Sequence, residues 1–150
     1  MVTIIFTVMS ATNVQFSVAV HMMTALAFHC GKELRSGILA ESVNADPGFI
    51  RRSLSKLVKA GLVVTTRGRY GSCALARPPE QITLLDIYRA SEAPPTIAIH
   101  HYPVEEACPI STHLKQSLAD LIEQCQSSFE RSLAKTTLAE LVADIRRRSR

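Results

Sequence analysis

The hydrophobic positions along the chain change their spacing several times and divide it into helices and short strands. Residues 15–30 are apolar on nearly all sides and are followed by Gly31, which predicts a helix buried over most of its surface. A shorter apolar pattern predicts a second helix over 36–44. In the next segment apolar residues recur four, seven and eight positions after the first, which predicts an amphipathic helix over 47–60. The residues of this stripe are Ile50, Leu54, Leu57 and Val58.

The helix over 47–60 carries start and stop signals at both ends. Asp46 is a good N-cap residue, and Pro47 stands at the first helical position, where its missing N–H costs nothing. Gly61 is suited to a left-handed cap at the other end. Since only a very short turn separates this helix from the one before it, the pair predicts a helix-turn-helix.

A β-hairpin is predicted directly after these helices, over 63–76. Two short β-type runs, "LVVTT" and "CALA", flank the segment "RGRYGS". Gly68 and Gly71 allow positive φ angles in the turn. A basic hairpin after a basic second helix is typical of a winged helix, so we assign 15–92 to a winged helix-turn-helix domain and expect a mainly α fold.

The remainder of the chain predicts two helices after a loop. Thr83 and Asp86 form a possible capping box for a helix that ends near residue 92, and 93–109 is a proline-rich loop. A helix of about 25 residues follows, with a near-heptad apolar stripe. Its positions are 110, 114, 118, 121, 122, 125, 129 and 133. Thr137 and Glu140 predict a second capping box for a last short helix.

The long stripe has no neighbour of equal length in the sequence. We therefore interpret 110–150 as a dimerisation helix with a short C-terminal helix, and the partner as a second copy of the chain. Packing of the long helix on the first helix of its own chain is the alternative.

Charge adds a functional indication. Charged residues make up 20% of the chain, hydrophobic residues 47%, and the net charge is +4. No acidic residue lies between Asp46 and Glu80, a stretch that contains Arg51, Arg52, Lys56, Lys59, Arg67, Arg69 and Arg77. Solvated surfaces usually mix both signs of charge, so this stretch favours binding to double-stranded DNA. A winged-helix module that binds an acidic protein is the alternative.

The basic helix and the hairpin supply the candidate DNA-contacting residues. They are Gly48, Phe49, Arg51, Arg52, Ser53 and Lys56 in the helix, and Arg67, Arg69 and Tyr70 in the hairpin. We expect Arg51 and Arg52 to reach base edges or phosphates of the major groove, because arginine reads guanine with two hydrogen bonds. Gly48 would allow close approach of the backbone, and Lys56 would meet a phosphate or solvent. The hairpin arginines favour a phosphate or the narrow minor groove.

Other classes of function have less support. No nucleophile with a base in a recognisable motif is present, and no glycine-rich loop is placed to hold a nucleotide, so we expect no enzyme. The four cysteines, at 30, 73, 108 and 125, show no zinc-like spacing and predict free thiols in a cytoplasmic protein. No segment reaches the roughly 18 apolar residues that span a membrane. Residues 1–14 are interpreted as an N-terminal extension, with Met9 as an alternative start.

Several of these stretches resemble the Rrf2 family of bacterial winged-helix regulators. "FIRRSLSKLVKAGLV" is similar to the recognition helix of the family, and "RGRYGSCALARPPEQITLLDIYRASE" to its wing and the segment after it. "CPISTHLKQSLADL" and "TTLAEL" resemble the start of its dimerisation helix and its terminal signature. The resemblance runs from about Gln15 to the end of the chain. It implies a homodimer with crossed long helices that reads a palindromic operator, usually as a repressor.

Two departures from the family pattern bear on function. The family wing commonly has consecutive glycines where this chain has Gly71 and Ser72, so Ser72 becomes a candidate phosphate donor. Members that bind an iron–sulfur cluster carry three cysteines before the dimerisation helix. Cys108 matches the last of them, whereas Tyr102 and Thr96 occupy the other two positions. Because such clusters use several thiolates, we expect no cofactor. A mixed site across the dimer, with His100, His101 and His113, is the alternative.

Cys108 is also the candidate sensing residue. It precedes a proline at a predicted helix start, where the helix dipole favours a reactive thiolate. A thiol-responsive regulator is one interpretation, and an inert cysteine with an unknown effector elsewhere is the other.

Overall fold

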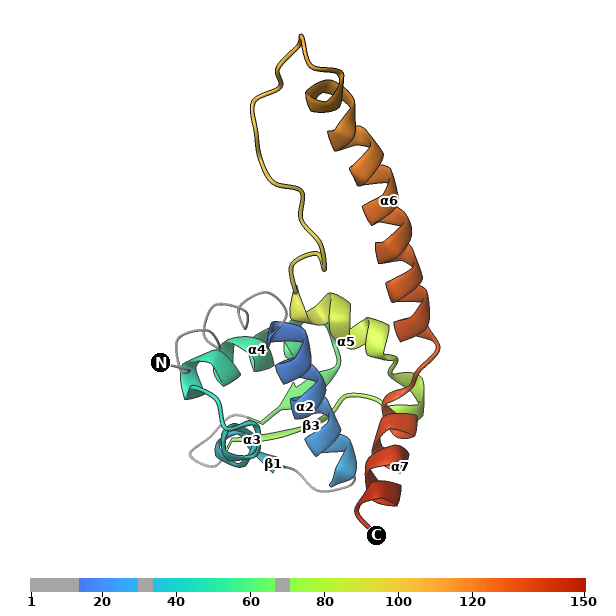
Figure 1. Cartoon of the computed structure of the whole chain (residues 1–150). Helices are drawn as coiled ribbons and strands as arrows, with labels where there is room; N and C mark the ends of the chain where they lie inside the picture. The colour runs from blue at the N-terminus through green and yellow to red at the C-terminus, as the bar shows by residue number, and fades with distance from the viewer. Residues whose placement is uncertain (1–13, 30–33, 67–70) are drawn as a thin grey trace, which may run out of the picture.

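The described residues, 14–29, 34–66 and 71–150, form a mainly helical protein with a small sheet. In this computed structural model the elements follow as α2 (Val14–Phe28), β1 (Leu34–Arg35), α3 (Ser36–Val43), α4 (Pro47–Lys59), β2 (Val63–Thr65), β3 (Ser72–Leu75), η1 (Pro79–Gln81), α5 (Leu84–Ser91), α6 (Pro109–Ala134) and α7 (Leu138–Arg148). Figure 1 shows α6 projecting from a compact group of the other elements. The predicted fold class is confirmed: a winged helix-turn-helix followed by a long helix.

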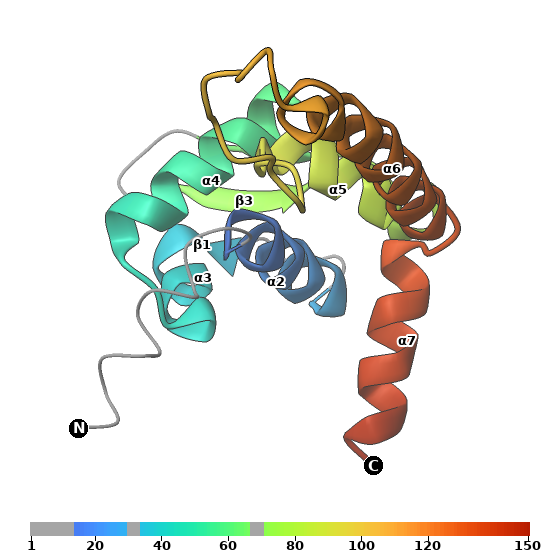
Figure 2. The ribbon, with the colours of Figure 1, turned by 45° about the horizontal axis from the view of Figure 1, so that its top comes forward.

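Helix α2 forms the centre of the core. Its residues are apolar on nearly every side, and Met22 and Met23 are completely buried. An all-round apolar helix is stable only when other elements cover it, and α3, α4, α5 and α7 all pack against α2. In Figures 1 and 2, α4 and α7 lie on opposite sides of α2, so the basic helix occupies one flank of the core.

The signals at the ends of α4 act as predicted. The Asp46 carboxylate accepts a hydrogen bond of 2.8 Å from the Phe49 N–H, and Pro47 is the first helical residue. Gly61 has a φ of +70°, which only glycine adopts without strain. Ile50 and Leu57 are buried. The helix is therefore fixed at both ends and along its apolar side, which leaves its basic side free to face a ligand.

The sheet has three strands in the order β1-β3-β2. Strands β2 and β3 form the predicted hairpin, antiparallel and with Val63 opposite Leu75. Strand β1 pairs with the other edge of β3, with Leu34 opposite Cys73. A strand of two residues has no alternation that a sequence pattern could reveal, so β1 was not predicted.

Both predicted capping boxes are present. Thr83 accepts from the Asp86 N–H while the Asp86 carboxylate accepts from the Thr83 N–H, and Thr137 and Glu140 do the same at the start of α7. An isolated β-bridge joins Thr83 to Thr137. The starts of α5 and α7 are thus held together, and this bridge carries α7 back to the core after α6.

Helix α6 packs on the helical core near its C-terminal end, at α5, and its first turn bonds to the loop before it. None of its residues is buried. The Phe129 ring meets the Tyr88 ring of α5 edge-on, with centroids 5.3 Å apart. Closer to the N-terminus of α6, the apolar residues Ile110, Leu114 and Leu121 are exposed. The alternative in which α6 lies on the first helix of its own chain is therefore not what the structure shows: its main contact is with α5.

Candidate nucleic-acid interface

Arg51 and Arg52 lie on the exposed side of α4, in its first half. Both are exposed, and in the described part of the chain neither forms an ion pair with a carboxylate. The Arg52 guanidinium lies 5.9 Å from the centroid of the Phe49 ring. Because a cation–π contact does not neutralise the guanidinium, its charge remains available to an anion.

Gly48 has a structural reason to be glycine. A Cβ at this position would lie 2.9 Å from Asp46 Oδ2 and 3.4 Å from an Arg52 terminal nitrogen. A larger residue would thus disturb the N-cap carboxylate and the arginine beside it. Phe49 is half-buried and packs against the core, so its ring supports Arg52 more than it faces outward.

Two predicted contact residues face inward. Ser53 is only 8% exposed, because it follows Ile50 by three positions and precedes Leu57 by four, which places it on the buried side of α4. Ser72 is likewise 8% exposed, and its hydroxyl lies 2.6 Å from the Thr66 hydroxyl. The expectation that these serines face DNA is therefore not supported. For Ser53, the helical spacing from Ile50 and Leu57 was enough to predict that it faces the core.

Lys56 was expected at a phosphate or in solvent and is placed elsewhere. Its Nζ lies 3.1 Å from Glu92 Oε2 and donates a hydrogen bond of 3.2 Å to the Ser91 carbonyl. Arg77, another cation of the acid-free stretch, pairs with Asp86 at 3.3 Å. Both carboxylates lie outside the acid-free stretch in sequence, so the run of like charge contained no sign of these pairs.

The structure describes both strands of the wing, as far as the residues on either side of its turn. The Thr66 N–H donates to the Ser72 carbonyl at 3.0 Å, and the Ser72 N–H donates to the Thr66 hydroxyl at 3.1 Å. Arg67, Arg69 and Tyr70 lie outside the described residues. The hairpin that carries them is confirmed, and their predicted roles stay predictions.

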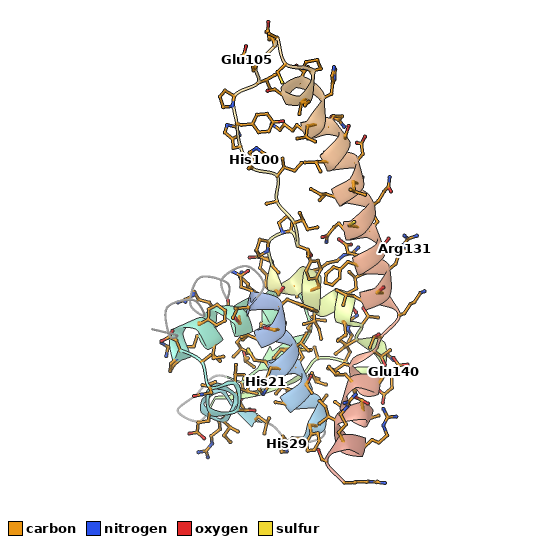
Figure 3. All side chains as sticks on the ribbon, viewed as in Figure 1. His21, His29, His100, Glu105, Arg131 and Glu140 are labelled. Carbon is orange, nitrogen blue, oxygen red and sulfur yellow. The ribbon has the colours of Figure 1, made fainter. Side chains whose placement is uncertain are left out.

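The loop before α6 contains the possible metal ligands and the candidate sensor. Cys108 is the N-cap residue of α6 and is half-buried. Tyr102 donates from its hydroxyl to the Ser111 carbonyl at 3.2 Å and stacks on His100, with centroids 4.7 Å apart. Figure 3 shows His100 on the loop beside α6 and Glu105 at its far end.

These residues do not fit an iron–sulfur cluster. Such clusters bind several thiolates, and the loop offers one thiol. Tyr102, which is hydrogen-bonded to Ser111, occupies one position where the cluster-binding members carry a ligand cysteine. Within the described residues, no group of three or more His, Cys, Asp or Glu is arranged to hold a metal ion. The other described thiols lie apart from this loop: Cys125 is exposed on α6, and burial raises the pKa of the Cys73 thiol in β3. The expectation of no cofactor stays a prediction.

No helix among the described residues has the length and hydrophobicity that a bilayer span requires.

The fold and the basic side of α4 together define a winged helix-turn-helix DNA-binding protein. Residues 12–144 match the model of the Rrf2 family, described as iron-dependent transcriptional regulators. The chain belongs to this family, and it is a transcriptional regulator and not an enzyme. The resemblance seen in the sequence is thereby confirmed.

Individual relatives agree with this assignment. The chain is 30% identical over 131 residues to YwnA of Bacillus subtilis, whose name describes an HTH-type transcriptional regulator, and the match covers 87% of this chain and 96% of YwnA. A crystal structure of a transcriptional regulator from Lactobacillus plantarum superposes with a TM-score of 0.76 and 31% identity, covering 89% of this chain and 90% of that one. IscR of T. potens superposes with a TM-score of 0.65 and 26% identity, covering 87% and 85% of the two chains.

Proposed function

We propose that the protein is a homodimeric repressor that reads a palindromic operator, with one α4 helix in the major groove of each half-site. The observation that carries this proposal is the pair of exposed guanidinium groups at Arg51 and Arg52. They stand on the second helix of a helix-turn-helix whose opposite side is fixed in the core. No carboxylate among the described residues neutralises their charge. We therefore expect them to donate hydrogen bonds to phosphates or to guanine edges.

The uncovered apolar residues of α6 support the proposed dimer. Ile110 is 69% exposed and Leu121 is 55% exposed. Water-exposed leucines and isoleucines in one stripe of a projecting helix are stabilised when a second copy covers them. A two-fold dimer would also place two α4 helices in symmetric positions, as a palindromic site requires.

The DNA contacts that we propose are fewer than those expected from the sequence. Arg51 and Arg52 form its centre, and Gly48 and Phe49 support them from within the helix. Arg67, Arg69 and Tyr70 of the wing remain as predicted. Ser53, Ser72 and Lys56 are left out of the contact set because their polar atoms are buried or already bonded.

The first test is selection of a binding site from a random pool of duplex DNA, using the purified full-length protein. We expect enrichment of a palindrome and at least a 1,000-fold preference over unrelated duplex near physiological salt, at the lower end of the range for sequence-specific binders, roughly 10³–10⁷. Failure to enrich any duplex would refute the proposal and would favour an acidic protein partner.

Substitutions then assign the contacts. Arg51→Ala or Arg52→Ala should cost about 1–3 kcal/mol on the selected duplex and relax the preference at one base pair if the side chain reads guanine. A phosphate contact would instead lower the slope of log K against log salt by about 0.9. Lys115→Ala, which removes an exposed cation of α6, is the matched control and should change neither. Arg67→Ala with Arg69→Ala tests the wing in the same titrations.

Repression and sensing need separate experiments. Repression predicts that the protein lowers transcription in vitro from a promoter that overlaps the selected palindrome; an increase would identify an activator. Anaerobic incubation with iron and sulfide is expected to give no cluster absorbance in the visible range. A stable chromophore would show that the dimer binds a cluster after all.

A further inference from the structure

Lys56 lies on the basic helix α4, but its charged group bonds to the C-terminal end of α5. Its Nζ bonds the Ser91 carbonyl, at the last residue of α5, and pairs with the adjoining Glu92. The last carbonyls of a helix have no hydrogen-bond partner within the helix. A cation beside them also interacts favourably with the negative end of the helix dipole. Glu92 has a φ of +52°, a left-handed conformation that glutamate adopts rarely. The lysine of α4 thus bonds the terminal carbonyl of α5, beside this left-handed residue.

The same short helix holds α6. Tyr88 packs edge-on against Phe129, and its hydroxyl accepts a hydrogen bond of 3.0 Å from Gln126. One residue further on, Arg89 pairs with Glu130 at 3.1 Å. Helix α5 therefore bonds α4 at its C-terminal end and α6 through residues of its last two turns, as the adjacency of α4, α5 and α6 in Figure 2 illustrates.

We propose that Lys56 is a positioning residue: it does not neutralise a phosphate, but fastens α4 to α5 and so sets the orientation of α4 relative to α6. The inference rests on the proposed function, in which α4 enters the groove and α6 forms the dimer. In such a dimer the angle between α4 and α6 decides how far apart the two reading helices stand. Half-sites on DNA lie at fixed distances, so a loosened α4 weakens binding and tolerates other spacings.

The two roles open to Lys56 predict opposite effects for its partner. If Lys56 were a phosphate contact, Glu92 would compete with DNA for it, and removing this carboxylate would strengthen binding. If Lys56 positions α4, Glu92→Gln weakens binding although the protein becomes more positive. Glu92 is largely exposed, with 60% of its side chain accessible, so this variant is expected to fold.

The experiment uses the full-length protein and the duplex selected by the wild type, in fluorescence anisotropy titrations over several salt concentrations. Lys56→Met and Glu92→Gln are each expected to weaken binding about fivefold, the size of one solvent-accessible ion pair. The double variant should be no weaker than Lys56→Met alone, because Lys56→Met already removes the ion pair that Glu92→Gln breaks. The salt slope should stay at the wild-type value in all three.

Two further measurements separate positioning from loss of fold or charge. On duplexes with the central spacer lengthened or shortened by one base pair, the variants should discriminate against the altered spacing several-fold less than the wild type. Lys59→Met removes the same charge from an exposed place on the same helix, and should leave the spacing preference intact. Thermal melting of each variant should remain a single transition.

Two results would overturn the positioning role of Lys56. One is unchanged or tighter binding by Glu92→Gln, and the other is a salt slope that falls by about one unit in Lys56→Met. Wild-type protein that selects no duplex at all would instead refute the proposed function, before either variant is tested.

Discussion

Leu121→Ala is expected to weaken the proposed dimer without disturbing the fold of the protomer. Leu121 lies near the middle of α6 and 55% of it is exposed. A residue at the midpoint of a long helix is covered by the partner helix whether the two cross in parallel or antiparallel directions. Since more than half of the residue is exposed in the protomer, its truncation should cost the protomer little.

The size of the effect follows from the exposed fraction. Full burial of a leucine side chain contributes about 2 kcal/mol. About half of Leu121 remains to be buried on association, which gives about 1 kcal/mol for each copy and about 2 kcal/mol for the dimer, because two-fold symmetry counts the residue twice. The dimer dissociation constant should therefore rise about 30-fold.

Sedimentation velocity over a concentration series measures that constant directly. Gln116→Ala, on the opposite side of α6, is the matched control and should leave it within about threefold of the wild type, about 0.6 kcal/mol. A dissociation constant for Leu121→Ala that is also within this range, or an equal effect of both substitutions, would refute the assignment of the apolar stripe to the dimer interface.

Three further predictions concern caps and thiols. Asp46→Ala removes the carboxylate that bonds the Phe49 N–H and should lower the free energy of unfolding by about 1 kcal/mol in urea titrations, while Asp46→Asn retains most of it. Hydrogen bonds from Thr137 hold the pKa of Glu140 below its usual value, so its contribution to stability is present at neutral pH and is lost as the pH falls through the lowered pKa. The melting temperature of Glu140→Gln should accordingly lie below that of the wild type at neutral pH and converge with it in acid; a gap that does not narrow would contradict this. If Cys108 senses oxidants, peroxide should weaken DNA binding reversibly in the wild type and in Cys125→Ser but not in Cys108→Ser; equal responses in all three would exclude Cys108.

The acid-free stretch contains two kinds of cation, those that no described carboxylate pairs with and those that form ion pairs within the protein. A run of like charge predicts a basic surface only where the cations find no partner elsewhere. Arg51 and Arg52 meet that condition in the described residues, whereas Lys56 and Arg77 pair with carboxylates on and beside α5. The DNA-binding class of the protein survives this correction because the family match supports it independently.

The local elements of this protein could be predicted from its amino-acid pattern alone. Asp46 with Pro47, the two capping boxes, the glycine after α4 and the apolar periods each act within a few residues. Because such short-range preferences agree with the final fold, reading the chain residue by residue was enough to find them. The family signatures are local in the same sense.

Which polar groups remain free depends instead on how the helices pack. Lys56 and Ser91 are 35 positions apart, and Gln126 and Tyr88 are 38 apart, and no period in the sequence links such pairs. The same holds for β1, which exists only because the edge of β3 is available to it. Chain folding brings together groups that sequence patterns treat as independent, and hydrogen bonds and ion pairs depend on distances of a few ångströms. The interface could therefore be outlined from the sequence, but its members could be chosen only in three dimensions.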